Sequence, residues 1–108
     1  MANVSFKQGE AKTLTLTVKD NGAGVDLSAA TIFLGVKKKK TDASFIIEKQ
    51  DADFDKSQAA AGVISVFLSD ADLSVDPGHY IGELKATFPD STIDKSADLS
   101  FRVEQAVT

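Results

Sequence analysis

The chain contains no cysteine and no tryptophan, and its 108 residues include one tyrosine, one histidine and two prolines. Without cysteine it cannot form a disulfide, a zinc site with cysteine ligands or a thiol nucleophile. No window approaches eighteen apolar residues, and residues 1–6 lack the basic and apolar stretches of a signal peptide. We therefore expect a protein that does not span a membrane and does not use the usual secretory route.

The composition is that of an ordinary folded protein, with 43% hydrophobic and 26% charged residues. A chain of this length fits one domain, residues 1–108, with a single core. Sixteen acidic and twelve basic side chains give a net charge of −4, which disfavours binding to nucleic acid or to an anionic membrane. Other proteins are the expected partners.

Apolar and polar side chains alternate in five segments, and this period of two predicts half-buried β-strands. Further short strands are predicted at 4–6 and 45–48, with turns at 20–24, 37–42 and 89–92. The side chains predicted to point inward are Leu14, Leu16, Val18, Ile32, Leu34, Val36, Ile64, Val66, Leu68, Tyr80, Gly82, Leu84, Ala86, Phe88, Ala97, Leu99, Phe101 and Val103.

The alternation stops in residues 51–61, where we predict a loop with a helical turn near 56–60. Short strands divided by turn signals, without an amphipathic helix, indicate an all-β protein. We expect an immunoglobulin-like antiparallel β-sandwich of about seven strands.

The junction at 76–80 is the most specific indication of this fold. Asp76, Gly78 and Tyr80 form an Asp-x-Gly-x-Tyr step into a strand. This step resembles the tyrosine corner of immunoglobulin-like sandwiches, in which a tyrosine hydroxyl ties the start of a late strand to the preceding crossover. We therefore predict a structural role for Tyr80 and for the turn before it.

Three aspartates, Asp51, Asp53 and Asp55, resemble the first half of a calcium-binding loop, because alternate carboxylates can converge on a hard cation. The rest of that loop requires glycine at its sixth position and glutamate at its twelfth. Lys56 and Gly62 stand there instead. We interpret the segment as a solvated acidic loop and predict no metal ligand.

No group of residues indicates catalysis. The single histidine, His79, has no nucleophile elbow or oxyanion turn to accompany it, so we interpret it as a surface residue. The basic run 37–40 is interpreted as a guard against edge-to-edge strand pairing, because its side chains splay to both faces. Without a phosphate loop or a paired acid and base, we expect neither a cofactor nor an enzyme.

Two apolar residues, Phe33 and Ile81, are predicted to point outward and to share the outer surface of one sheet. Contiguous exposed apolar area usually marks a contact site, so both are candidate interface residues. A register slip of one residue would place them in the core instead. Both interpretations fit the sequence.

Four segments in order resemble the N-terminal immunoglobulin-like domain of phage upper baseplate proteins. The pattern is a G-[DE]-x-K-T-[LF] strand, a [VI]-D-L-[ST]-x-A link, a G-x-[VI]-x-[VI] strand and a P-G-x-Y-x-x-E-[LI] corner. The matching segments are GEAKTLTLTVKD at 9–20, VDLSAAT at 25–31, GVISV at 62–66 and PGHYIGEL at 77–84.

The resemblance implies a non-enzymatic structural module of a phage or prophage tail, assembled into the virion in the cytoplasm of the host bacterium. It implies docking onto other tail or baseplate proteins, or onto copies of the same chain, and it brings no catalytic residue or cofactor. Because 105–108 end the chain without heptads, we expect a stand-alone accessory protein or a fragment. The alternative is a bacterial cell-surface immunoglobulin-like module for adhesion or carbohydrate binding.

Overall fold

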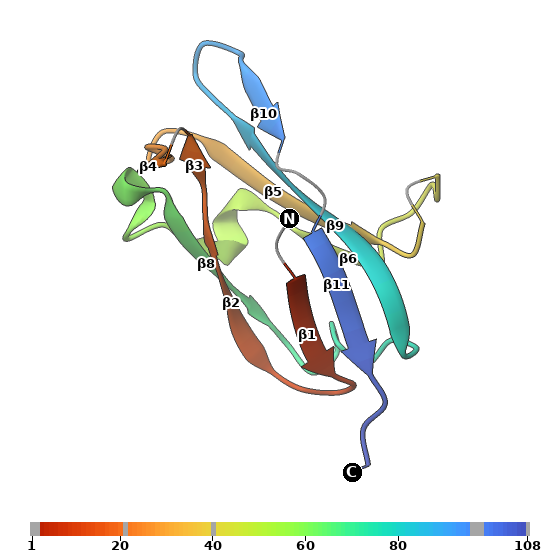
Figure 1. The fold of residues 1–108 in the computed structure, drawn as a ribbon. Coiled ribbons are helices and arrows are strands. Elements are labelled where there is room, and N and C mark those ends of the chain that lie inside the picture. The colour runs from red at the N-terminus through yellow and green to blue at the C-terminus, as the bar shows by residue number, and fades with distance from the viewer. Residues whose placement is uncertain (1–2, 21, 40, 96–98, 108) are drawn as a thin grey trace.

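Two β-sheets lie against each other in the computed structural model, which describes residues 3–20, 22–39, 41–95 and 99–107 (Figure 1). Sheet A has the strand order β1-β11-β9-β5-β6, and β10 also pairs with β9. Its strands are β1 (Asn3–Lys7), β5 (Thr31–Lys37), β6 (Ile47–Lys49), β9 (Gly78–Thr87), β10 (Ile93–Lys95) and β11 (Leu99–Glu104). Sheet B has the order β2-β8-β7, with β2 (Lys12–Thr17), β7 (Phe54–Asp55) and β8 (Val63–Leu68).

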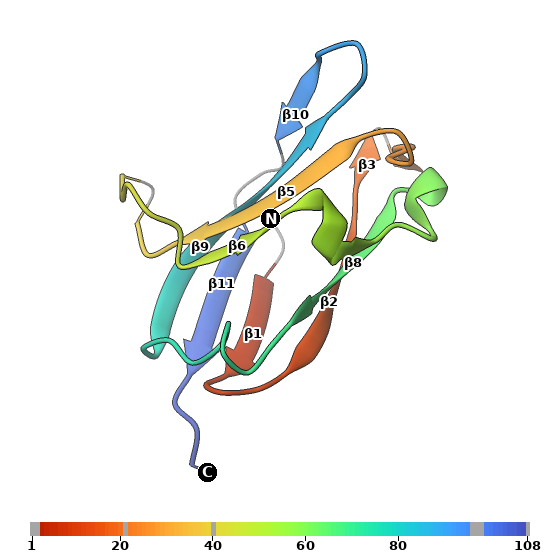
Figure 2. The ribbon, with the colours of Figure 1, turned by 180° about the vertical axis from the view of Figure 1, so that it is seen from behind.

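The alternation in the sequence accounts for the packing between the sheets, because every second side chain of a strand points to the same face. In Figure 2, β2 and β8 of sheet B lie to the right of β1, β11 and β9 of sheet A. The predicted inward residues of β5, β8, β9 and β11 are buried in one core, with Phe88 partly buried at the end of β9. On β2, Leu14 is buried, and Leu16 and Val18 are partly buried against the same core. Ala97 lies outside the described residues. The prediction of an all-β sandwich is confirmed.

One strand pair differs from the antiparallel arrangement that the sequence predicted. β1 runs parallel to β11, from Asn3 opposite Ser100 to Lys7 opposite Glu104. The reason is that β1 belongs to sheet A and the next strand, β2, to sheet B, so the chain crosses between sheets instead of turning back in a hairpin. The other pairings among the described residues are antiparallel.

The number of strands also exceeds the expected seven, because several ladders are only two or three residues long. β7 and β10 are such strands, and so are β3 (Lys19–Asp20) and β4 (Ala23–Gly24). The strand predicted at 45–48 is shifted, since β6 begins at Ile47 and leaves Phe45 and Ile46 exposed. The shift arises because Ile46 closes the connection from β5 with a 2.7 Å hydrogen bond to the Val36 carbonyl oxygen.

The segment predicted as a loop at 51–61 is more ordered than expected. It contains two 3₁₀ turns, η1 (Asp51–Asp53) and η2 (Ala59–Ala61), on either side of β7. Phe54 and Ala59 in this segment are buried in the core. Neither has alternating neighbours, so the period-two pattern could not reveal them. No helix of the described chain is long and apolar enough to cross a membrane.

Tyr80 joins the start of β9 to the turn before it. Its hydroxyl donates a 2.5 Å hydrogen bond to the carbonyl oxygen of Asp76. Burial, and then the Asp76 carboxylate, raise the pKa of Tyr80, so the hydroxyl keeps the proton that it donates. Gly78, between these two residues, has a φ of 153°, which residues with a side chain rarely adopt. The Nζ of Lys38 lies 4.8 Å from the centre of the Tyr80 ring. The structural role of this corner stays a prediction.

We predict that Tyr80→Phe lowers the free energy of unfolding by about 1 kcal/mol, because it removes one hydrogen bond and keeps the ring in the core. The shift of the denaturant midpoint measures the loss. Asp76→Ala is the matched control, since the acceptor is a backbone carbonyl that the substitution retains. An equal loss in both variants would contradict the assignment to the hydroxyl.

Candidate functional site

Phe33 and Ile81 both lie on the outer face of sheet A, the face that points away from sheet B. In the β5–β9 ladder Phe33 is opposite Lys85, and Ile81 is opposite Lys37. Four residues separate the two apolar side chains along the ladder, which is about 13 Å at the rise of a β-strand. Both side chains are partly buried. They share one face, and other residues form the surface between them.

The ring of Phe45 occupies part of that surface, over Gly35. Phe45 comes from the connection between β5 and β6, and its ring meets that of Phe33 edge to face, with centroids 5.3 Å apart. A Cβ atom on Gly35 would lie 2.4 Å from Cε1 of Phe45, which is closer than real Cβ contacts come. The glycine therefore allows the ring to lie against the sheet.

Two lysines cover the rings from either side. The Nζ of Lys37 lies 4.9 Å from the centre of the Phe45 ring, and that of Lys85 lies 5.3 Å from the centre of Phe33. Both distances suit a cation–π contact. We call Phe33, Phe45, Lys37 and Lys85 the aromatic cluster. Phe45 nevertheless keeps 41% of its surface exposed, and the adjacent Ile46 keeps 44%.

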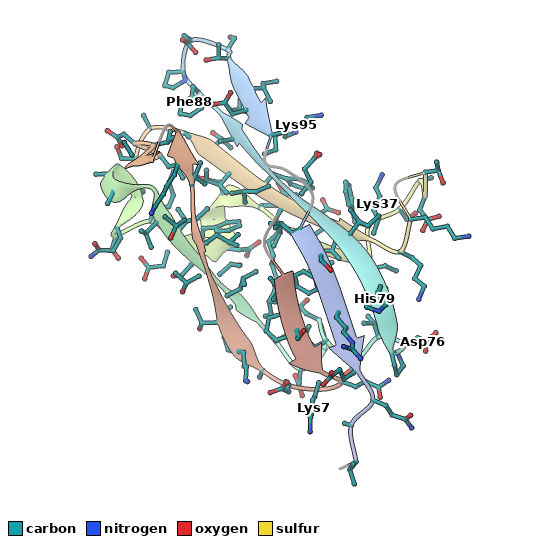
Figure 3. The ribbon with its side chains drawn as sticks, in the orientation of Figure 1. Lys7, Lys37, Asp76, His79, Phe88 and Lys95 are labelled. Atoms are coloured by element: carbon teal, nitrogen blue, oxygen red, sulfur yellow. The ribbon has the colours of Figure 1, made fainter. Side chains whose placement is uncertain are left out.

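Among the described residues on the outer face of sheet A, basic side chains outnumber acidic ones, although the whole chain has a net charge of −4. Figure 3 shows Lys95, Lys37 and His79 spread along this face. The basic residues that the ladders place on it are Lys7, Lys37, Lys85, Lys95 and Arg102, and the acidic ones are Glu48, Glu83 and Glu104. The exposed His79 is opposite Arg102 and lines a shallow polar hollow with it.

The outer face of sheet B has a different character. Its side chains on β2 and β8 are threonine, serine, valine and phenylalanine, namely Thr13, Thr15, Thr17, Val63, Ser65 and Phe67. The Thr15 and Ser65 hydroxyls lie 3.1 Å apart in a hydrogen bond, and Phe67 keeps 54% of its surface exposed. The charged groups thus favour one side of the sandwich.

The three aspartates of the acidic segment bind backbone amides separately. Asp51 accepts a hydrogen bond from the Ile32 amide, Asp53 from that of Gln50, and Asp55 from that of Ser57. No group of three histidine or acidic side chains in the described part of the chain is arranged to hold a metal ion. Each carboxylate therefore caps a turn or a strand end by accepting a backbone hydrogen bond.

Asp51 connects the two sheets on the side of the sandwich where β6 leads into β7. Its Oδ1 accepts from Ile32 N at 2.9 Å and from Lys56 Nζ at 3.2 Å, and the same Nζ donates to the Ala30 carbonyl at 2.5 Å. The Ile32 amide, and then the Lys56 ammonium, hold the pKa of Asp51 below its ordinary value, although partial burial opposes them.

The outer face of sheet A therefore presents aromatic rings, lysine stems and ammonium groups on a rigid ladder. These groups suit contact with an apolar surface that also carries carboxylates. The sequence indicated Phe33 and Ile81 for this face but missed Phe45. A glycine inside a strand is a signal of close approach, and Gly35 could have indicated that a ring lies over it.

A family model described as the BppU N-terminal domain matches residues 1–108. No curated protein sequence matches the chain significantly. Among solved structures, the N-terminal domain of phage TP901-1 ORF48 is similar, with a TM-score of 0.66 and 12% identity over 94% of this chain and 83% of that one. CopC from Methylosinus trichosporium OB3b has a TM-score of 0.55 and 13% identity, covering 100% of this chain and 89% of its own. At these identities the two structures show a shared fold.

We predict that Gly35→Ala costs about 1–2 kcal/mol of stability, because the new methyl group displaces the Phe45 ring from the sheet. In a Phe45→Ala background the same substitution should cost far less, since the ring that blocks the methyl group is gone and only Cε2 of Phe33, 3.1 Å away, remains close. Denaturant unfolding of the four proteins in this double-mutant cycle measures the coupling. Additive effects would show that the ring does not depend on the glycine.

We also predict that Asp51 contributes stability that is lost in acid. Its folded-state pKa is lowered, so the contribution is present above the ordinary value of 3.8 and disappears as the pH falls through the folded-state pKa. Asp51→Asn keeps the shape and removes the titration. The variant should be less stable than the wild type at neutral pH, and the difference should shrink below about pH 4. A difference that is the same at every pH would contradict this role for the charge.

Proposed function

Since the chain belongs to the BppU N-terminal domain family, the N-terminal domains of phage baseplate upper proteins, we propose that it binds neighbouring baseplate proteins through the outer face of sheet A. The family makes it a virion-associated structural domain. We propose three things beyond this role: that the domain contacts other baseplate proteins, that it does so through this face, and that the baseplate is assembled in the cytoplasm of the host bacterium. No catalytic step is part of this function.

The observation that supports this surface is the aromatic cluster. Phe33 and Phe45 meet edge to face on the solvent side of sheet A, where Phe45 remains partly exposed. Aromatic residues are enriched in the centres of protein interfaces, and an exposed apolar patch bordered by polar groups is typical of a binding site. Ile81 on β9, opposite Lys37, adds a further apolar side chain to the same face.

The charges around the cluster specify the kind of partner. Lys37 and Lys85 lie over the two rings, so a surface that covers the rings must also meet their ammonium groups. A partner with carboxylates around an apolar patch would pair with both, and such complementary charges fix orientation as well as partner choice. We therefore propose a tail or baseplate protein with an acidic rim around an apolar contact.

The test is assembly in the phage or prophage that encodes the chain, with Phe33→Glu and Ile81→Lys introduced together. Purified variant protein should still unfold cooperatively, because both side chains point away from the core. The expected result is tails that lack complete baseplates in electron micrographs. Phe67→Glu is the matched control, since it places a similar charge at an exposed phenylalanine of the opposite sheet and should leave assembly unchanged. Complete baseplates carrying the folded double variant would overturn the proposed surface.

A further inference from the structure

Strand β2 ends sheet B and pairs on one side only. Within the described residues its ladder partner is β8, from Lys12 opposite Leu68 to Thr17 opposite Val63. On its other side, no other backbone group and no side chain of the described residues hydrogen-bonds its amides and carbonyls. An edge of this kind is a template for a further strand.

On the opposite side of the sandwich, the described strand edges are short or bound by side chains. Where β5 extends past β6, Asp51 binds the Ile32 amide and Lys56 binds the carbonyl oxygen of Ala30. The edge strands β6 and β7 are three and two residues long. By contrast, β2 has six residues, contains no proline, and has its one charge at Lys12, where Glu10 pairs with it at 3.0 Å. The usual devices against edge-to-edge pairing are missing from the middle of this strand.

The core is also incompletely covered beside β2. Leu16 of β2 points inward but is only partly buried, and so is Val4 of β1. β1 is the edge strand of sheet A, and residues 8–11 connect it directly to β2. The two edges therefore border the same side of the sandwich. A strand added to β2 would cover apolar side chains as well as satisfy backbone groups.

We propose that β2 pairs antiparallel with β2 of a second copy of this chain. The register with the greatest overlap places Thr15 opposite Thr15, Leu14 opposite Leu16 and Thr13 opposite Thr17. Directly opposite residues share a face in an antiparallel ladder, so threonines meet outside and leucines meet inside. Lys12 falls opposite Val18, and no like charges oppose each other within the strand.

This strand is therefore complementary to itself, which is the requirement for a two-fold interface. The pairing joins sheet B of one copy to sheet B of the other in a continuous sheet. It uses the side of the sandwich between β1 and β2, whereas the proposed baseplate contact uses the outer face of sheet A. The two proposals can fail independently.

Thr15 provides the test because it lies at the two-fold axis and its side chain is exposed. Thr15→Lys and Thr15→Glu each place like charges opposite one another, and each should weaken dimerisation about tenfold or more. A mixture of the two variants should dimerise again, because lysine then faces glutamate. Thr31→Lys is the control, since it puts the same charge at an exposed position of β5, away from this edge, and should leave the dimer intact.

Light scattering across a wide concentration range measures the mass of each protein and of the mixture. Hydrogen exchange of the β2 amides gives a second readout. The amides that point to the unpaired edge of β2 should become protected from exchange only as the dimer forms. A wild-type protein that stays monomeric at every concentration would overturn the proposal, and the free edge would then await a strand from a different protein. A dimer that survives Thr15→Lys, or a mixture that stays monomeric, would overturn it equally.

Discussion

The sandwich depends on covering a wide sheet with a narrow one. Sheet B has three strands and cannot by itself cover the inner face of sheet A. Residues outside the strands complete the core, and Leu27, Ala59 and Leu73 are fully buried in it. Burying a leucine side chain stabilises a protein by about 1.5–3 kcal/mol. Backbone hydrogen bonds hold these segments in place, from Leu27 to Ala59 and from Gly9 to Leu73.

This difference in width also explains which parts of the fold the sequence could predict. Long strands have a period of two, so the inward residues of β5, β8, β9 and β11 follow from it directly. The residues that fill the core beside sheet B have no period. Leu27 precedes a turn, and Leu73 lies in the crossover before β9. Their burial depends on segments distant in sequence, which a local pattern cannot include. β10 was missed for a related reason, because Ile93 is exposed and the other two residues of the strand, Asp94 and Lys95, are charged.

The candidate site was predictable to a similar extent. The alternation placed Phe33 and Ile81 on one face, but the position of Phe45 depends on a glycine in another strand. The spacing of Asp51, Asp53 and Asp55 indicated carboxylates close in sequence. Which amide each would bind depends on the tertiary fold. The family was indicated by the order of four short motifs along the chain and not by any reactive side chain. A structural domain acts through shape and surface, so its chemistry leaves little trace in individual residues.

The parallel pairing of β1 with β11 has a mechanical consequence. The chain enters β1 at Asn3, beside Ser100, and leaves β11 at Glu104, beside Lys7. Tension applied to the two ends of the chain would therefore pull these strands past each other along their length. In that geometry the hydrogen bonds between the strands are loaded together, in shear, instead of opening one after another from an end. The domain would resist stretching along the chain better than its modest size suggests.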